Sequence, residues 1–212
     1  MEKKQFVEKI TELLEKNKKK KFAQSVELCI NFKEIQMEKP EYKLKLDVVL
    51  PKGRGKKINI GVFADSDTAI QAKTLTEYVL GKEDIQEYAK SKRKMRTYAS
   101  KCNKFIAQPD LMAVIGKTWG IVLGPRAKMP QPIPPKAPIE PIMNRLKNTV
   151  SVISKKLPTV HAAIGTENMS ADDLAENAMA IMNAIGRQIT ADKLKSVYVK
   201  TTMGEPVKIE LE

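Results

Sequence analysis

The chain has 212 residues, with 38 Lys and Arg against 25 Asp and Glu, and its formal net charge is +13. This excess of cations favours an anionic partner, either nucleic acid or an acidic membrane surface. No run approaches the ~18 apolar residues of a membrane span. The only cysteines, Cys29 and Cys102, lie far apart and support neither a disulfide framework nor a zinc site. We therefore expect a cytoplasmic protein with reduced, buried thiols.

The first quarter of the sequence switches from helical to strand periodicity. Apolar residues at helical spacing predict an amphipathic helix over residues 3–17, which the run Lys18 to Lys21 follows. Strict alternation then predicts strands over 25–32 and 43–50, and we expect these two strands to pair antiparallel. The segment 51–57, PKGRGKK, places two glycines among cations and predicts a domain boundary.

The middle of the chain has a different pattern, in which short apolar runs alternate with helical stretches. The run INIGVFA is almost wholly apolar, which is typical of a strand covered on both faces. Such alternation predicts a parallel, Rossmann-like α/β layer. The expected strands and helices cover residues 58–64, 67–72, 104–108, 111–123, 139–146 and 150–154.

The C-terminal part returns to antiparallel character. A strand is predicted over 159–165, a helix over 172–186 that Ser170 caps, and a strand over 196–200. The fold class is therefore α/β with two domains. Residues 1–55 and 157–212 form a discontinuous α+β domain with an antiparallel sheet, and residues 56–156 form an inserted three-layer Rossmann-like domain. The expected hinge residues are Gly53, Gly55 and Pro158.

An uncharged corner, Thr201-Thr202-Met203-Gly204, joins the last alternating strand to a second strand. Two hydroxyls, a thioether and a glycine that admits close approach suit contact with a flat polar surface. In a protein this basic, we interpret that surface as the sugar edge of RNA. Phe22 follows the lysine run, and its side chain has two interpretations, a core staple or an exposed ring against ribose.

Other candidate chemistry is weaker. His161, the only histidine, has no nucleophile that spacing identifies and is interpreted as a structural or RNA-contacting residue. The proline-rich segment 124–138 lacks the glycine spacing of a phosphate cradle and is expected to be an exposed loop.

An alternative function is a nucleotide-dependent enzyme built on the middle domain. The acids of Ala64-Asp65-Ser66-Asp67, at its first strand-to-helix turn, would repel phosphate.

Several motifs, taken together and in order, resemble one family. The segments KKKKFAQSVEL, LPKGRGKK, PDLMAVIGK, LGPRAKMPQP, TVHAAIG and SVYVKTTMGEPVKI look like the ribosomal protein L-one family in its archaeal form. The resemblance implies a non-enzymatic protein without cofactors or a metal site, monomeric when free. It implies binding to the large-subunit rRNA of the mobile stalk beside the tRNA exit site, repression of the protein's own mRNA, and only indirect contact with exit-site tRNA.

The resemblance also implies which residues contact RNA. They are Phe22, Ser25 and Glu27 at the first strand, with Ser196, Thr202, Met203 and Gly204 near the C-terminus. Bacterial members usually carry Thr where this chain has Ser25, which retains the hydroxyl. We add Lys21 and His161 as expected RNA contacts, because of charge and strand position respectively. Bacterial members also follow LGPR with a different run from AKMPQPIPPKAP, so two interpretations of that loop stay open, an RNA or partner contact and plain structural bridging.

Overall fold

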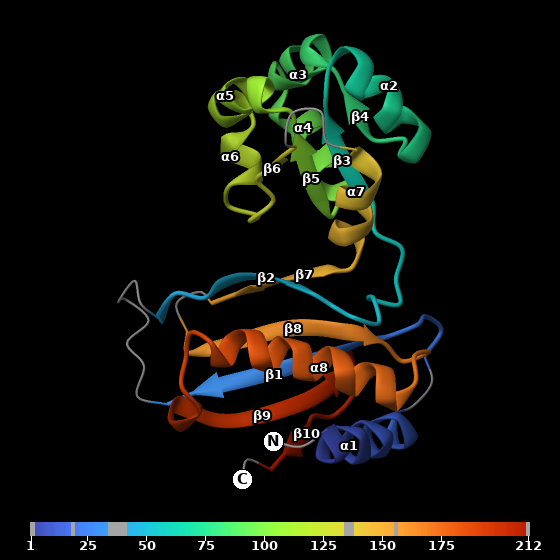
Figure 1. The fold of residues 1–212 in the computed structure, drawn as a ribbon, viewed down its shortest axis with the longest axis vertical. Coiled ribbons are helices and arrows are strands. Elements are labelled where there is room, and N and C mark those ends of the chain that lie inside the picture. The colour runs from blue at the N-terminus through green and yellow to red at the C-terminus, as the bar shows by residue number, and fades with distance from the viewer. Residues whose placement is uncertain (1–2, 18–19, 34–41, 134–137, 155–156, 211–212) are drawn as a thin grey trace. The chain divides into compact units, whose positions relative to one another are not determined.

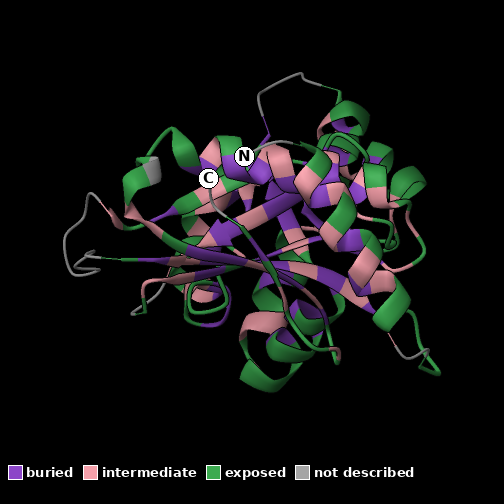
Figure 2. Cartoon of the chain, turned by 90° about the horizontal axis from the view of Figure 1, so that it is seen from below, coloured by how far each residue is buried: buried purple, intermediate pink, exposed green. Residues whose placement is uncertain are grey.

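The computed structural model describes residues 3–17, 20–33, 42–133, 138–154 and 157–210. The chain forms two compact units, here called unit 1 (residues 1–56 and 148–212) and unit 2 (residues 57–147). Figure 2 shows that buried residues gather along the strands and the inner helix faces. The α/β fold class with antiparallel and parallel sheets is confirmed.

Unit 1 is built on an antiparallel sheet of four strands in the order β10-β9-β1-β8 (Figure 1). Two helices cover one face of this sheet, and a two-stranded ribbon of β2 and β7 packs beside them. The bounds are α1 Lys3–Lys16, β1 Ser25–Phe32, β2 Lys45–Val49, β7 Thr149–Ile153, β8 Thr159–Thr166, α8 Ala171–Gly186, β9 Leu194–Thr201 and β10 Val207–Ile209.

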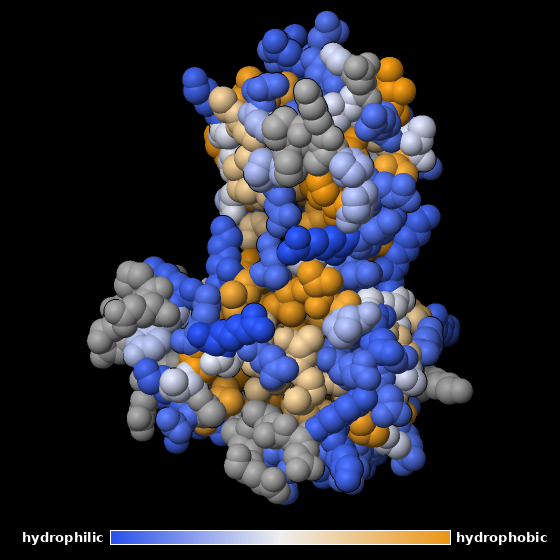
Figure 3. Space-filling model, in the orientation of Figure 1, coloured by the Kyte–Doolittle hydropathy of each residue, from blue (hydrophilic) through white to orange (hydrophobic). Residues whose placement is uncertain are grey.

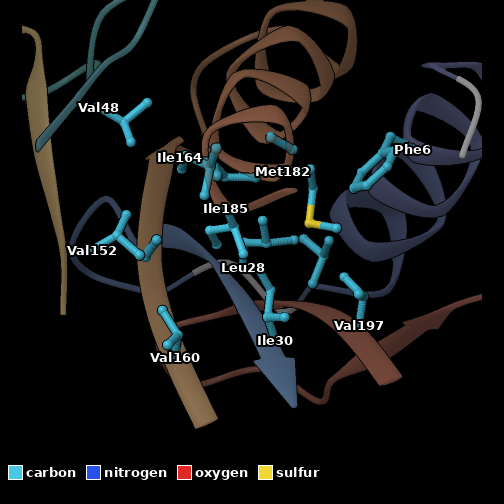
Figure 4. Close-up of a cluster of buried hydrophobic side chains, with 14 of the residues drawn as sticks. Phe6, Leu28, Ile30, Val48, Val152, Val160, Ile164, Met182, Ile185 and Val197 are labelled. Carbon is cyan, nitrogen blue, oxygen red and sulfur yellow. The ribbon is translucent and has the colours of Figure 1, made fainter. Parts of the chain in front are cut away.

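Alternation along β1 explains why one face of the sheet is covered. Val26, Leu28, Ile30 and Phe32 are buried in the same apolar cluster as Phe6 of α1. Figure 4 labels Leu28, Ile30 and Phe6 in this cluster. Burying each such aliphatic side chain stabilises the fold by about 1.5–3 kcal/mol. The intervening residues of β1 point to the opposite face, so the sheet has one core face and one outer face.

The start of α8 is also as the sequence predicts. Ser170 Oγ accepts a hydrogen bond from Asp173 N at 3.2 Å, and Asp172 and Asp173 occupy the first turn. The cap satisfies one free N–H, and the acids complement the positive end of the helix dipole.

The predicted pairing of the first two strands is wrong. β1 lies between β8 and β9 and therefore has no free edge, whereas β2 pairs with β7 through Val48 and Val150. Alternation shows which face of a strand is buried but not which strand lies beside it. Long-range packing decides this pairing.

The second crossing between units comes earlier in the chain than the sequence suggests. We expected residues 56–156 to form the inserted domain, yet unit 2 ends at residue 147. β7 belongs with unit 1 because it pairs with β2, and because its buried Val150 and Val152 join the same core as Val48. A short apolar run has the same sequence pattern in a parallel sheet and in this antiparallel ribbon, so the pattern does not show to which of the two the strand belongs.

The expected hinge residues are all held inside unit 1. Gly53 and Gly55 have φ of 71° and 64°, the left-handed region that glycine tolerates best. The carbonyl of Gly53 accepts a 2.9 Å hydrogen bond from the buried Asn177 side chain. Pro158 accepts a 2.9 Å hydrogen bond from Phe32 N, next to β8. Both glycines therefore belong to unit 1, and their role as a hinge stays a prediction.

Unit 2 is a three-layer α/β unit around a parallel sheet in the order β4-β3-β5-β6. One apolar cluster includes Trp119 and Phe105, and a second includes Ile106 and Met143. The bounds are β3 Ile60–Phe63, α2 Ser66–Leu75, β4 Val79–Leu80, α3 Lys82–Ala89, α4 Lys92–Lys101, β5 Lys104–Ala107, α5 Pro109–Thr118, α6 Gly120–Leu123, β6 Gln131–Pro132 and α7 Ile139–Lys147.

The segment 124–138 is less open than expected over its described part. Pro130 and Ile133 are buried, and β6 pairs with β5 at the edge of the sheet. Arg126 Nη1 donates hydrogen bonds to Arg96 O at 3.3 Å and to Ser100 Oγ at 3.1 Å, which tie the turn to α4. Residues 134–137 lie outside the described residues, so for them an exposed loop stays a prediction.

Candidate nucleic-acid interface

The outer face of the unit 1 sheet gathers three of the predicted RNA contacts. Glu27 lies on β1, between Ala163 of β8 and Lys200 of β9 in the strand register. On the same face His161 is registered opposite Cys29, and Ser196 opposite Asn31. Both α1 and α8 bury their apolar residues against the other face. Residues far apart in the sequence thus meet on one polar surface.

Hydrogen bonds run across this outer face. Asn31 Nδ2 donates to Ser196 Oγ at 3.0 Å, and Thr159 Oγ1 donates to Asn31 Oδ1 at 2.9 Å. Ser196 is buried, with 8% of its surface exposed, so it holds Asn31 in place more than it offers its own hydroxyl. Sequence reasoning missed Asn31, although its place at period two from Glu27 and Cys29 was a usable signal.

Cys29 and His161 form a pair on the same face, with 3.1 Å between Cys29 Sγ and His161 Nδ1. Burial raises the pKa of the Cys29 thiol, which is therefore protonated at neutral pH. Cys29 and Cys102 are both free and buried, as expected. His161 is exposed, so its ring remains accessible to a partner.

The Thr201–Gly204 corner lies directly against the start of β1. Thr202 N donates to Ser25 O at 3.0 Å, and Ser25 N donates to Thr202 Oγ1 at 3.2 Å. Met203 is 65% exposed. Phe22 is 51% exposed and is not a core residue, which leaves the interpretation of an exposed ring. The structure thus joins Ser25 to Thr202 and leaves two large apolar side chains in water.

A buried polar network supports the corner from below. Gln24 is fully buried; its Oε1 accepts from Met203 N at 3.0 Å and its Nε2 donates to Asn17 Oδ1 at 3.0 Å. Thr201 Oγ1 also donates to Asn17 Oδ1, at 3.2 Å. Asn17 Nδ2 in turn donates to Glu167 Oε2 at 2.6 Å. No local pattern signals this network, because its members come from four separate segments.

Gly204 is needed by the corner itself. Its N–H donates to Thr201 O at 3.3 Å, and a Cβ at position 204 would collide with Thr201 Oγ1. The sequence interpretation was that this glycine lets a partner approach the backbone. The structure adds an internal reason, so a substitution at Gly204 disturbs the corner whether or not a ligand is bound.

Two hollows flank the corner and bring cations to it. The larger, about 700 Å³, lies between α1 and β10 and includes Lys16 and Lys208 in its wall. The smaller, about 460 Å³, includes Lys21 and Phe22, and Lys20 borders both. Lys20 and Lys21 are exposed, whereas residues 18–19 of the predicted lysine run lie outside the described residues. The corner therefore has an apolar and hydroxyl-bearing tip with lysines on both flanks, although Glu12, Glu205 and Glu210 also line the larger hollow.

The first strand-to-helix turn of unit 2 is not shaped as a phosphate cradle. Asp65 caps α2, its Oδ1 accepting from Ser66 N at 2.9 Å, so a carboxylate occupies the helix N-terminus. Over the part of the chain that can be described, no group of three or more His, Cys, Asp or Glu could hold a metal ion. Within the same residues no helix is long and apolar enough to cross a membrane.

Comparisons with known proteins identify the family of this chain. Residues 13–205 match the model of the ribosomal protein L1p/L10e family. The chain is 46% identical to large ribosomal subunit protein uL1 of Thermococcus kodakarensis, covering 96% of each chain. It is 42% identical to the uL1 of Archaeoglobus fulgidus, covering 99% of each. These relatives are named as ribosomal proteins, in agreement with the expectation of a non-enzymatic protein. The chain therefore belongs to the ribosomal protein L1p/L10e family.

Proposed function

We propose that this protein is a component of the large ribosomal subunit that binds the rRNA of the mobile stalk beside the tRNA exit site. The outer sheet face and the Thr201–Gly204 corner form the contact surface. The protein also represses translation of its own mRNA by binding a similar RNA structure there. It is monomeric when free, cytoplasmic and ribosome-associated, and contacts exit-site tRNA only indirectly, through the rRNA.

The observation that carries this proposal is the composition of the corner. Exposed Met203 follows Thr202, whose hydroxyl bonds to Ser25 at the start of β1, and exposed Phe22 lines a neighbouring hollow with Lys20 and Lys21. The wide, shallow minor groove of RNA presents 2′-hydroxyls and is read by shape, so short hydroxyl and apolar groups suit it. The lysines supply sequence-independent attraction to phosphate, and the uncharged tip supplies specificity.

The test is to measure the affinity of the full chain for a stalk rRNA fragment and for an unrelated RNA duplex. Met203→Ala should weaken binding to the stalk fragment about tenfold or more and leave the duplex unchanged, because it removes packing but no charge. Met129→Ala is the matched control, since Met129 is a 43% exposed methionine of unit 2. Equal affinity of the unsubstituted protein for both RNAs would contradict the proposed specific binding.

The repressor activity needs a separate measurement. Translation of the protein's own mRNA in a cell-free system should fall as the protein is added, and excess stalk rRNA fragment should restore it. Both RNAs would compete for the same corner, so Met203→Ala should also weaken repression. Repression that the stalk fragment does not relieve would argue against a shared binding surface.

A further inference from the structure

Unit 2 has a pocket that the proposed function does not use. It is lined by the last turn of α3 and one face of α4 and has a volume of about 540 Å³, within the range of small-ligand sites. Tyr88 and Tyr98 contribute aromatic surface to it, and Arg93, Lys94 and Lys101 line it as well. The pocket therefore combines ring surfaces with three cations.

The cations of α4 are not explained by the stability of the helix. The sequence of α4, KRKMRTYASK, contains five Lys or Arg and no Asp or Glu. Lys92, Arg93 and Lys94 stand in its first turn, where they oppose the positive end of the helix dipole. Ser91, the N-cap residue, makes no side-chain hydrogen bond there. A phosphate beside this face would convert an unfavourable charge cluster into a favourable one.

One acid also faces the pocket. Glu87 Oε1 lies 3.7 Å from Lys94 Nζ, and both side chains are more than half exposed, so the pair is weak. Arg93, Thr97 and Lys101 follow one another at intervals of four residues, so they lie on one face of α4, and all three line the pocket. Cations outnumber the acid on this rim. Figure 3 shows hydrophilic side chains over much of the visible surface of unit 2, in keeping with the charge of the chain.

The tyrosines form a rigid aromatic wall. Tyr88 stacks on Trp119 with ring centroids 6.1 Å apart, and Tyr98 meets the same indole edge-on at 5.9 Å. Tyr98 is 9% exposed, and its buried hydroxyl has no hydrogen-bond partner among the described residues. Burial raises the pKa of this phenol, so it is a neutral donor at physiological pH. A ligand with polar edges and flat faces would match this wall.

We propose that this pocket binds a nucleotide of single-stranded RNA, with its base against Tyr88 and Tyr98 and its flanking phosphates near Arg93 and Lys101. Aromatic rings accept any base face, and cations beside them follow the backbone, which is how single strands are bound without strict sequence preference. A paired base stays stacked in its duplex and cannot enter. From the proposed function this site takes only the premise that the protein meets RNA; it belongs to unit 2, whereas the Thr201–Gly204 corner belongs to unit 1.

The only tryptophan of the chain gives a local measurement of this binding. Trp119 is buried against both pocket tyrosines, and its Nε1 donates to Ile85 O of α3 at 3.1 Å. A base that enters the pocket should change Trp119 fluorescence. We would titrate the full-length protein with a single-stranded hexanucleotide of mixed sequence, an RNA duplex of equal length, and free adenosine monophosphate. The hexanucleotide should give a saturable change and the other two a much weaker one.

Two double variants test the role of the cations. Arg93→Gln with Lys101→Gln should weaken hexanucleotide binding about tenfold and flatten the salt dependence by roughly 1.4, the slope for two phosphates on a single strand. Lys73→Gln with Lys147→Gln makes the same change of charge on α2 and α7, whose core is the second apolar cluster of unit 2. This control lowers the net charge equally but changes no cation of the pocket, so it should bind within about twofold of the unsubstituted protein.

Each alternative outcome overturns the proposal. If both double variants weakened binding equally, the loss of net charge alone would explain the effect. If the duplex changed Trp119 fluorescence as much as the hexanucleotide, the pocket would not be specific for an unstacked base. Equal affinity for free adenosine monophosphate would show that the ligand of the pocket is a mononucleotide and not an RNA strand. A loss of thermal stability in the Arg93→Gln, Lys101→Gln variant would assign these cations a structural role. Failure of the stalk-RNA test with a normal Trp119 response would affect the proposed function alone.

Discussion

Thr202 has a hydroxyl that bonds within the fold and that we also propose as an RNA contact. Its Oγ1 accepts from Ser25 N and donates to Ser25 O, both at 3.2 Å, while its side chain is exposed and accessible to a partner. Sequence reasoning identified the residue as a contact but not its bond to Ser25, which lies 177 positions away in the chain. Its role in recognition and its role in the corner therefore have to be separated by experiment.

Thr202→Val should lower affinity for the stalk RNA by about 1–3 kcal/mol, because the RNA group that bonds to this hydroxyl would stay desolvated without a partner. Thr202→Ser, which keeps the hydroxyl, is the control and should retain most of the affinity. Binding to an unrelated duplex should change little in either variant, as measured by filter binding or anisotropy. If valine weakened both RNAs equally, the hydroxyl would act only through the shape of the corner.

Gln24 is the residue that we expect to matter most for holding the corner. Gln24→Met keeps the side-chain volume but removes the partners of Met203 N and Asn17 Oδ1, at a cost of about 1–3 kcal/mol in the free energy of unfolding. Gln188→Met makes the same change at an exposed position and should cost less than about 0.5 kcal/mol. Urea denaturation measures both. Equal stability of the two variants would show that the network does not stabilise the corner.

At the scale of elements, α8 fixes the turn that leads out of β2. Asn177 is fully buried on α8; its Oδ1 accepts from Lys52 N at 3.1 Å, and its Nδ2 donates to Gly53 O and to Ile164 O at 2.9 and 2.8 Å. One side chain therefore joins a helix, a strand and a turn. This explains why the turn around Gly53 is held within unit 1.

Asn177→Leu should destabilise the full chain by at least about 2 kcal/mol, because it leaves buried backbone groups without partners. Asn183→Leu is the control on the exposed side of the same helix and should have a small effect. Amide hydrogen exchange should show faster exchange at Lys52 in the first variant only. A normal exchange rate at Lys52 would show that Asn177 does not hold this turn.

At the scale of the whole molecule, the boundary at β7 leads to a direct comparison of two deletions. Residues 1–56 joined to 148–212 keep β7, which pairs with β2 and supplies Val150 and Val152 to the core. We expect this chain to fold and to retain specific RNA binding, because every RNA contact predicted from the sequence lies in unit 1.

Residues 1–55 joined to 157–212 lack β7 and should be unstable. Removing Val150 and Val152 exposes part of the core, and large core deletions cost several kcal/mol. Circular dichroism and thermal unfolding distinguish the two deletions. Equal stability of both would show that the β2–β7 ribbon adds little to unit 1, and an unfolded longer deletion would show that unit 1 depends on unit 2.

Local sequence by itself determined most of the elements and the character of the surface. The alternation of SVELCINF gave β1 its observed bounds, Ser170 with Asp172 and Asp173 marked the start of α8, and the lysine excess predicted an anionic partner. These features depend on neighbours within a turn or two of the chain, so periodicity and capping chemistry are sufficient to predict them.

The tertiary structure alone decided which strands pair and which side chains meet. The pairing of β2 with β7, the network of Gln24, Asn17, Thr201 and Glu167, and the tyrosine pocket of unit 2 all join segments distant in sequence. The sequence also did not show that Thr201 Oγ1 occupies the space that a Cβ at position 204 would need. Such contacts follow from how whole elements bury their apolar faces against one another, and no local period encodes that choice.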